Sequence, residues 1–321
     1  MSAGEQILAL AGGVGGAKLA HGLAMTMEAE KLVVAVNTGD DFEHLDFYIS
    51  PDLDTVMYNL AEINNTETGW GVTGESWNFM DALARFGGET WFRLGDRDLA
   101  THVERTRRLR AGEALSDITE NLCSRLGIAC AVIPMSDGPV RTIVETSTGE
   151  TLPFQDYFVR LACAPQVTGF RFDGADQAEP APALARMMEG DSIGAVIICP
   201  SNPYVSIAPM LAIPAFGAFI KSRKIPVAAV SPIVGGQAIK GPAAKMMAEL
   251  GVDISALGIA RHYEGLIDGL VIDEADRDLL RPIEELGIKV LVTNTIMRDV
   301  AEKSRLAEQT VEFARRLKVT A

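Results

Sequence analysis

Residues 7–41 read ILALAGGVGGAKLAHGLAMTMEAEKLVVAVNTGDD, and this stretch decides the fold class. It begins with the short apolar run Ile7–Ala11, which leads into a glycine-rich loop at 12–16. A helical pattern follows over Ala17–Met27, and then the β-branched apolar run Leu32–Val36. This order of strand, glycine loop, helix and strand is the opening of a βαβ unit.

Four apolar runs later in the chain predict more strands of the same sheet. They are Ala195–Cys199, Pro226–Val230, Gly269–Ile272 and Lys289–Val292. Apart from Lys289 at the start of the last run, the runs are apolar, which is typical of parallel strands that helices cover on both faces. The chain is therefore expected to form an α/β fold, with a Rossmann-like, mostly parallel sheet flanked by helices.

The middle of the chain has a different pattern. Three helical patterns lie within residues 75–126, and strand-like runs follow at 131–134, 140–146 and 151–159. The turn residues Thr148-Gly149-Glu150 predict an antiparallel hairpin between the last two runs. We therefore expect a Rossmann-like nucleotide-binding core of residues 1–61 and 174–321, interrupted by an inserted α+β subdomain of residues 62–173.

The composition indicates a folded protein that does not bind polyanions in general. Of the 321 residues 48% are hydrophobic, which excludes an intrinsically disordered chain. With 29 Lys and Arg against 43 Asp and Glu, the formal net charge of −14 argues against a general binder of nucleic acid or anionic membranes. The cysteines lack zinc-type spacing, and neither a signal peptide nor a membrane span is predicted. We expect a cytoplasmic protein with reduced thiols.

The glycine loop is a candidate phosphate-binding site. Gly12, Gly13, Gly15 and Gly16 let the backbone approach a ligand closely, and the start of the next helix favours an anion. Lys18 adds a positive charge. The spacing matches neither a Walker loop nor the full G-x-G-x-x-G fingerprint. A tight turn that serves only packing is the alternative.

Five aspartates follow the strand at 32–36 within a short stretch: Asp40, Asp41, Asp46, Asp52 and Asp54. Ligands of open α/β sheets bind at this end of the strands. Carboxylates beside a phosphate loop repel one another unless a hard cation neutralises them, and magnesium prefers carboxylate and phosphate oxygens. We therefore expect at least one of the five to bind magnesium. Helix capping is the alternative for Asp52 and Asp54, because a helical pattern follows them.

Two later loops offer polar side chains. The loop after the 195–199 run contains Ser201, Asn202 and Ser206, which suit a nucleotide base or phosphate. The loop after residue 134 contains Ser136 and Asp137. For both loops a turn without function is the alternative.

A charged and aromatic region suits a flat ligand. The loop 93–98 carries Arg93 and Arg97, which can bind an acid or a planar polar ring; a helix cap at Asp98 and a simple ion pair are the alternatives. Nearby aromatic residues either pack in a core or form a stacking wall: Trp70, Trp77, Phe79, Trp91 and Phe92. The histidines form no zinc-hydrolase pattern and no G-x-S-x-G is present, so a zinc hydrolase and a serine nucleophile are unsupported.

Seven motifs in one order resemble an enzyme family, the 2-phospho-L-lactate / phosphoenolpyruvate transferases of coenzyme F-420 biosynthesis. The resemblance runs from Leu8 to about Asp276, and the shared order makes it specific. The motifs are GGVGGAK at 12–18, NTGDD at 37–41, ISPDLDT at 49–55, LGDRDLATH at 94–102, PMSD at 134–137, PSNP at 200–203 and VSPIVGG at 230–236.

The resemblance implies a Rossmann-like, magnesium-dependent homodimer with two small-molecule substrates. The donor would be lactyl- or enolpyruvyl-diphosphoguanosine, and the acceptor 7,8-didemethyl-8-hydroxy-5-deazariboflavin. A terminal ribityl hydroxyl of the acceptor would attack the donor's phosphorus, and GMP would leave. Phosphoryl transfer of this kind depends on positioning and charge neutralisation more than on covalent catalysis.

Specific residues receive roles from the resemblance and from their chemistry. Asp40 and Asp54 would bind magnesium, and Asp41 or Asp52 would orient the attacking hydroxyl. Asp54 and Arg93 match family positions that contact the deazaflavin, and Trp70 or Trp91 would stack on its ring, with the inserted subdomain helping to form this site. The donor would be held by Gly12, Gly13, Gly15, Gly16, Lys18, Ser136, Asp137, Ser201, Asn202 and Ser206.

Two other functions stay open at this point. A non-catalytic nucleotide-sugar-binding regulator of related fold would share the glycine loop but would not need Asp40, Asp54 or Arg93. A dinucleotide-dependent oxidoreductase would need the full glycine fingerprint, which fails here. The residues do not decide between a lactyl and an enolpyruvyl donor.

Overall fold

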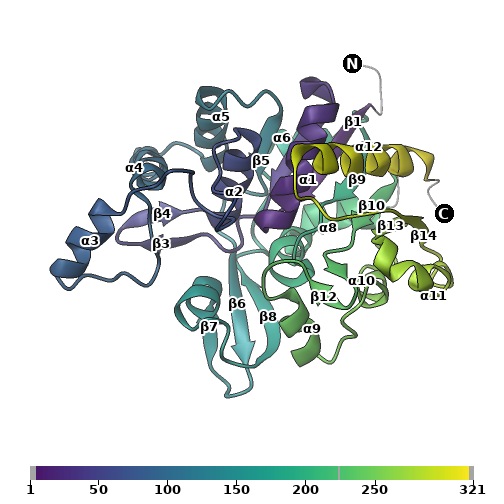
Figure 1. The fold of residues 1–321 in the computed structure, drawn as a ribbon. Coiled ribbons are helices and arrows are strands. Elements are labelled where there is room, and N and C mark those ends of the chain that lie inside the picture. The colour runs from purple at the N-terminus through teal and green to yellow at the C-terminus, as the bar shows by residue number, and fades with distance from the viewer. Residues whose placement is uncertain (1–4, 223–224, 318–321) are drawn as a thin grey trace.

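A seven-stranded parallel sheet forms the centre of the molecule (Figure 1). The computed structural model describes residues 5–222 and 225–317. All neighbouring strands pair in parallel, in the order β14-β13-β10-β9-β1-β2-β5. The predicted α/β fold is therefore confirmed. The strands are β1 (Gln6–Ala11), β2 (Leu32–Val36), β5 (Ala131–Pro134), β9 (Ile193–Ile198), β10 (Val227–Val230), β13 (Gly269–Ile272) and β14 (Lys289–Val292).

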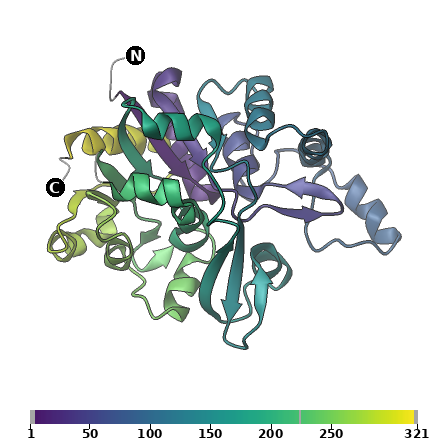
Figure 2. The same ribbon diagram turned by 180° about the vertical axis from the view of Figure 1, so that it is seen from behind.

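Helices cover both faces of this sheet, as Figures 1 and 2 show from opposite sides. In β1, Ile7 and Ala9 belong to the apolar core on one face, whereas Leu8 and Leu10 belong to the core on the other. Because both faces are buried, the strands read as unbroken apolar runs. One face is covered by α1 (Gly13–Thr26), α2 (Pro51–Leu60), α5 (Leu115–Arg125) and α12 (Val300–Arg316). The other is covered by α6 (Pro182–Glu189), α8 (Pro214–Lys221), α10 (Ala256–His262) and α11 (Leu280–Glu284).

The strand order reverses between β1 and β9. From β1 the chain moves outward through β2 to β5, and it then returns to add β9, β10, β13 and β14 on the other side of β1. Connections from such neighbouring strands leave in opposite directions, so a crevice opens outside their carboxyl ends. The fold thus places the best ligand position between the loops that follow β1 and β9.

The middle of the chain adds a small antiparallel sheet and also contributes to the main one. β6 (Arg141–Thr146) pairs with β7 (Thr151–Pro153), which confirms the hairpin, and with β8 (Val167–Asp173) on its other side. The strand predicted to run to Val159 ends at Pro153, because the chain turns into the π-helical η2 (Asp156–Arg160). β5 pairs in parallel with β2, although the expected insertion includes it. Its short apolar sequence carries no sign of strand direction. The division at residues 62 and 173 stays a prediction.

An arm projects from the core at the left of Figure 1. It consists of the hairpin β3 (Phe42–His44) and β4 (Phe47–Ile49), the helix α3 (Asn78–Arg85) and the loop from α3 to α4 (Asp96–Arg110). Ile49, Met80 and Leu94 form its own small core. The hairpin was not predicted because its turn residues Leu45 and Asp46 take φ values of 52° and 61° without a glycine or asparagine to indicate them.

Two carboxylates join α3 to α4. Asp96 accepts a hydrogen bond from Ser76 Oγ and two more from the N–H groups of Asn78 and Phe79 at the start of α3. These hydrogen bonds lower the pKa of Asp96 to about 2. Glu75 accepts from the N–H groups of Arg97 and Asp98 at the start of α4. Because each carboxylate satisfies the free donors of a helix end, the loop that carries Arg93 is held at both sides.

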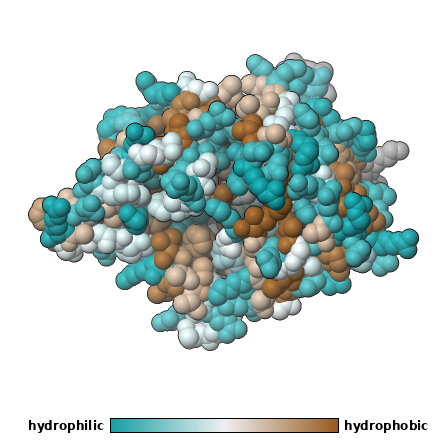
Figure 3. Space-filling view, in the orientation of Figure 1, coloured by the Kyte–Doolittle hydropathy of each residue, from teal (hydrophilic) through white to brown (hydrophobic). Residues whose placement is uncertain are grey.

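The remaining elements are short: η1 (Ala29–Lys31), η3 (Pro203–Ile207), α7 (Ala208–Ala212), β11 (Ile233–Val234), β12 (Gln237–Ala238), α9 (Ala243–Glu249) and η4 (Glu274–Leu279). Among the described residues no single helix is long and apolar enough to cross a membrane; one pair, Pro203–Ala212 with Pro214–Lys221, passes that test jointly but is bent by 98°. On the face shown in Figure 3, hydrophilic residues dominate and hydrophobic residues gather in its lower middle.

The packing of α1 on α12 predicts the effect of a glycine substitution. Gly22 lies inside α1, where alanine normally stabilises a helix by about 1 kcal/mol. Here a Cβ would overlap the main-chain carbonyl of Lys303, so we expect Gly22→Ala to lower the free energy of unfolding by about 1–3 kcal/mol. Urea unfolding measures this. Met25→Ala, at an exposed position of the same helix, should change it by less than about 0.5 kcal/mol; a gain in stability from Gly22→Ala would contradict the tight packing.

Candidate functional site

The glycine loop packs directly on the loop that follows β9. Gly12 N–H donates a hydrogen bond to Ser201 Oγ at 3.1 Å. A Cβ on Gly15 would overlap the carbonyl of Pro200, and one on Gly16 would lie 2.5 Å from Ser201 Oγ. The loops after β1 and β9 therefore meet at the reversal of strand order, and the glycines are needed for this close approach. Ser206 joins them, with its Cβ 2.6 Å from the position of a Cβ on Gly12.

The start of α1 holds a carboxylate of the protein itself. Gly13 N–H donates to Asp52 Oδ1 at 2.6 Å, and Gly13 has a φ of 62°. Asp52 lies in the first turn of α2, so it does not cap that helix; the capping alternative is wrong for this residue. The free N–H groups and the dipole of α1 favour negative charge at this position. The same features suit a phosphate group.

Asn37 connects two of the predicted aspartates. It follows β2, and its Nδ2 donates to Asp40 Oδ1 and to Asp52 Oδ2, both at 2.9 Å. Asp41 lies beside them and accepts a hydrogen bond from Ser50 Oγ at 2.9 Å. Asp40, Asp41 and Asp52 are all buried, and we call these three residues the carboxylate cluster. Asp46 is separate, since it lies exposed in the turn of the arm.

Burial makes the ionised form of this cluster costly. Burial, together with the charges of Asp52 and Asp41, raises the pKa of Asp40 well above its usual range. Burial also raises the pKa of Asp52, against the hydrogen bonds from Asn37 and Gly13. For Asp41, burial raises the pKa to about 7, although Arg141 and Ser50 favour its ionised form. Three buried carboxylates at neutral pH therefore need protons or a cation.

The donor set fits a hard cation. One oxygen of Asp41 and the hydroxyls of Thr38 and Thr142 are buried without a hydrogen-bond partner among the described residues. Thr142 belongs to β6 and reaches this position because its N–H donates to Gly39 O at 2.6 Å. Carboxylate and hydroxyl oxygens with free lone pairs are the ligands that magnesium takes in proteins.

Asp54 belongs to a neighbouring buried network. Arg105 donates to both of its oxygens, to Oδ2 at 3.0 Å through Nη1 and to Oδ1 through Nη2. His102 Nδ1 lies 3.6 Å from Asp54 Oδ2, and His102 Nε2 lies 3.3 Å from Asp98 Oδ2. Capping is therefore wrong for Asp54, and also for Asp98, whose carboxylate is bound to Tyr58.

Asp54, Asp98 and His102 could themselves hold a metal ion. Their ligand atoms all lie within 4.8 Å of one another, and all three residues are buried. The guanidinium of Arg105 supplies a positive charge at the same place. Protein-held carboxylates that bind a metal commonly accept hydrogen bonds from such a partner, so the network is compatible with a metal near Asp54.

The arm gathers the predicted acceptor residues in two groups. The Arg93 guanidinium lies 4.1 Å from the ring centroid of Trp77. The ring of Trp70 packs against the same tryptophan, with the two ring centroids 6.3 Å apart. Trp91 lies in a different group, against Phe42 and His44. Arg93 and Trp70 are exposed, so their surfaces are free to contact a flat ligand.

Four predicted donor residues are engaged elsewhere. Ser136 Oγ donates to Glu179 O at 2.7 Å, and Asp137 accepts from Ser116 N–H at the start of α5. Asn202 Oδ1 accepts from Tyr204 N–H and thereby caps η3. Lys18 Nζ donates a hydrogen bond to Met297 O at 2.9 Å. Burial, and to a smaller extent the positive charge of Lys240 nearby, lowers the pKa of Lys18. These contacts account for the folded positions of the four side chains; their roles toward a donor stay predictions.

Sequence reasoning missed several residues of the site. Asn37 stands in the quoted NTGDD motif, and its position directly after β2 was the available signal. Nothing in the sequence distinguishes Arg105 from Arg107, Arg108 and Arg110 on the same helix. Trp77 was one of five aromatics without a distinguishing feature. The contact of the Arg141 guanidinium with Tyr48 Oη at 3.1 Å could not be predicted, because it depends on the antiparallel sheet.

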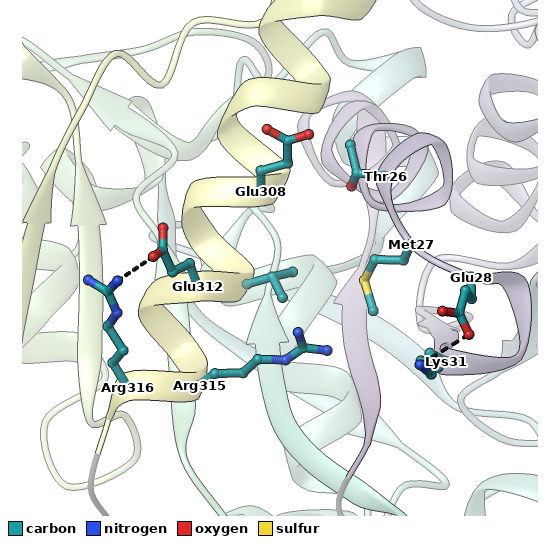
Figure 4. Close-up of a pocket in the computed structure, with 9 residues that line it drawn as sticks. Thr26, Met27, Glu28, Lys31, Glu308, Glu312, Arg315 and Arg316 are labelled. Atoms are coloured by element: carbon teal, nitrogen blue, oxygen red, sulfur yellow. Dashed lines mark hydrogen bonds and ion pairs between the residues drawn. The ribbon is translucent and has the colours of Figure 1, made fainter.

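The two cavities described in the structure lie away from the carboxylate cluster. One, of about 500 Å³, lies between the ends of α1 and α12 and is lined by Thr26, Glu308 and Arg315 among others (Figure 4). It is at the opposite end of α1 from the glycine loop, about 20 Å away at 1.5 Å per residue. The other, of about 510 Å³, lies between α6 and α8.

The fold and the site define an α/β enzyme whose ligand edge combines a glycine loop with buried carboxylates, a combination suited to phosphate chemistry. Residues 7–309 match the family model described as 2-phospho-L-lactate transferase CofD. The chain belongs to this family. It is an enzyme of the 2-phospho-L-lactate / phosphoenolpyruvate transferase type, in coenzyme F-420 biosynthesis, as the motifs predicted.

Relatives match over nearly the whole chain. A phosphoenolpyruvate transferase of Streptomyces griseus is 40% identical over 314 residues, which cover 96% of this chain and 98% of the relative. A 2-phospho-L-lactate transferase of Methanosarcina mazei is 35% identical, covering 95% and 99%. A solved structure of a UPF0052 family protein from Bacillus halodurans has a TM-score of 0.61 at 12% identity, covering 97% and 99%, and shows the fold alone. These matches favour the transferase over the regulator and the oxidoreductase.

The pKa of Asp41 predicts a pH dependence of stability. The unfolded chain releases this proton near pH 3.8, whereas the folded protein retains it up to about pH 7. The folded state therefore binds more protons between these values, and its free energy of unfolding falls with rising pH, by up to about 1.4 kcal/mol per unit for this group. Without added metal, Asp41→Asn should be more stable than the native protein at pH 8, and the difference should shrink toward pH 4.

Urea unfolding at several pH values measures this difference. Asp191→Asn, at an exposed position, serves as the control. A constant offset between Asp41→Asn and the native protein across the pH range would contradict the buried state of Asp41.

Proposed function

We propose that the enzyme moves a phospho-lactyl or phospho-enolpyruvyl group from a diphosphoguanosine donor to 7,8-didemethyl-8-hydroxy-5-deazariboflavin and releases GMP. The observation that carries this proposal is the position of Asp40 and Asp52, which share the amide of Asn37 beside the glycine loop. A diphosphate at the start of α1 would share a cation with these carboxylates. The names of the relatives supply the two candidate three-carbon acids of the donor.

The donor is proposed to lie in the crevice between β1 and β9. The glycine loop, Ser201 and Ser206 form its floor, and the free N–H groups of the first turn of α1 suit the diphosphate. Lys18, with Lys240 near it, adds positive charge on one side. Asn202, Ser136 and Asp137 are proposed to border the guanosine.

Magnesium is proposed as the cation, with Asp40 and Asp54 as its protein ligands. When bound, it would supply charge neutralisation for the diphosphate. Asn37 and Arg105 then act as the hydrogen-bonding partners that orient these two carboxylates. Asp41 and Asp52 are proposed to accept a hydrogen bond from the ribityl hydroxyl and to direct its oxygen at the phosphorus.

The acceptor is proposed to lie between the core and the arm. Arg93 and Trp70 present exposed surfaces there, and Trp91 is proposed to contact the ring from the β3–β4 side. Arginine and tryptophan both stack on flat polar rings. Asp54, which the resemblance assigns to the deazaflavin, would contact its ribityl chain.

The cellular setting is proposed from the thiols and from the resemblance. All four cysteines are free, which suits the reducing cytoplasm. By resemblance, the enzyme is proposed to be a homodimer, which light scattering of the purified protein tests.

The decisive experiment offers both donors to the native enzyme and to Asp40→Asn. Mass spectrometry follows GMP and the deazaflavin product, and the donor that turns over identifies the acid. We expect Asp40→Asn to lose about 100-fold or more in kcat, because a charged ligand of the cation is gone. The fold should survive, since the change removes charge repulsion within the buried cluster.

Asp191→Asn is the matched control and should turn over at the native rate. Near-normal turnover by Asp40→Asn would contradict the proposal that the reaction takes place at the carboxylate cluster. Absence of product from the native enzyme with either donor would sink the proposed reaction itself.

Metal removal gives a separate prediction. Chelation by EDTA should abolish transfer, because the diphosphate and the carboxylate cluster then repel each other. Addition of magnesium in excess should restore it. Circular dichroism should stay unchanged throughout, and full activity after exhaustive chelation would contradict the requirement for a cation.

A further inference from the structure

Arg105 is the largest side chain that the structure buries completely. It lies in α4, with a relative exposure of 0%, whereas its neighbour Arg107 is 64% exposed in its side chain. Removing a guanidinium from water costs several kcal/mol, so a buried arginine is retained only where its partners are well placed. A residue that served merely to fill space here would be apolar.

The partners of Arg105 are concentrated on one carboxylate. Nη1 and Nη2 donate to the two oxygens of Asp54, and Nη1 lies 3.4 Å from His102 Nδ1. Nε has no hydrogen-bond partner among the described residues. The planar fork of arginine thus fixes both the position and the plane of the Asp54 carboxylate, which a lysine could not do.

The connection between α2 and α4 does not depend on this pair alone. Tyr58, one turn after Asp54 on α2, bonds through its hydroxyl to Asp98 Oδ1 at 2.7 Å and to Thr101 Oγ1 at 2.8 Å, both on α4. These bonds already join the two helices. The Arg105 pair is therefore not needed to join the helices, and its further effect is to hold the Asp54 carboxylate, which lies beside Asp98 and His102.

We propose that Arg105 is a positioning residue of the transfer reaction: it touches neither substrate, and it holds Asp54 in the orientation in which Asp54 meets the acceptor and the cation. This inference rests on the proposed function. Each carboxylate oxygen has two lone pairs, so a bond from Arg105 leaves one on each oxygen for a ligand. Loss of the fork would free the carboxylate to rotate, and misplacement by about 1 Å costs on the order of 100-fold in rate.

A double-mutant cycle tests the inference. The variants are Asp54→Asn, Arg105→Gln and the double variant, with Arg107→Gln as the matched control on the same helix. If Arg105 acts only through Asp54, Arg105→Gln loses about 10- to 100-fold in kcat/KM for the acceptor, and the double variant is no worse than Asp54→Asn within about twofold. Arg107→Gln stays within about twofold of the native enzyme, because the ion pair that Arg107 forms with Glu104 is exposed.

A purely structural role gives a different pattern. Tyr58→Phe weakens the same junction without touching Asp54, so it should lower the melting temperature while kcat stays within about twofold of native. A rate loss by Tyr58→Phe equal to that of Arg105→Gln would overturn the proposal. So would losses that multiply in the double variant, or native activity of Arg105→Gln.

The cycle also works if Arg105→Gln does not fold. The double variant places two neutral amides where an ion pair stood and leaves no unpaired buried charge, so it is the more stable of the two. Its comparison with Asp54→Asn alone then decides: equal rates support the role of Arg105, and a further loss overturns it. A native enzyme without transfer would overturn the proposed function itself, which is a distinct result.

Discussion

The amide of Asn37 donates to Asp40 and Asp52 at the same distance of 2.9 Å, and the arrangement of the site depends on this bridge. It joins the loop after β2 to the first turn of α2. Asp52 in turn accepts from Gly13 at the start of α1, so the loops after the two neighbouring strands β1 and β2 are tied together by three side chains. The glycine loop can then lie against Ser201 beyond β9. Without the bridge, the loop after β2 would no longer be tied to the first turn of α2 and, through Asp52, to the start of α1.

The carboxylates and the cations near the site come from different parts of the chain. The core supplies the carboxylates, whereas the cations that face them come from segments that the middle of the chain adds. Arg105 lies on α4, and Arg141 reaches Tyr48 and the carboxylate cluster from β6. Neither cation neutralises Asp40 or Asp52 by direct contact among the described residues. At neutral pH the site therefore needs protons or a cation, and a divalent cation bound with a diphosphate meets that need.

The sequence predicted the parallel sheet and part of the site, and there are physical reasons why it did not predict the rest. The unbroken apolar runs predicted the parallel sheet, because burial of both strand faces leaves that pattern directly in the residues. The glycine loop, Asp40 and Ser201 followed as well, since each comes directly after a strand. Arg105 and Trp77 did not, because their importance arises only when distant helices pack. The β3–β4 hairpin was missed because Leu45 and Asp46 take positive φ values that their residue types rarely adopt.

The pairing of β5 with β2 has a consequence for how such an enzyme can change. The chain leaves the sheet at Val36 and re-enters it on the adjacent strand at Ala131, which pairs with Val33. The two ends of this long excursion are therefore one strand spacing and three residues apart, about 11 Å in all. A segment whose two ends lie close together can change in length with little effect on the strands that it connects. It can be lengthened, trimmed or exchanged without altering the order of the seven strands. Asn37, Asp40, Asp52 and Asp54 lie in the first part of this segment and Arg105 in the last, so the part open to variation is the stretch between them, which carries α3.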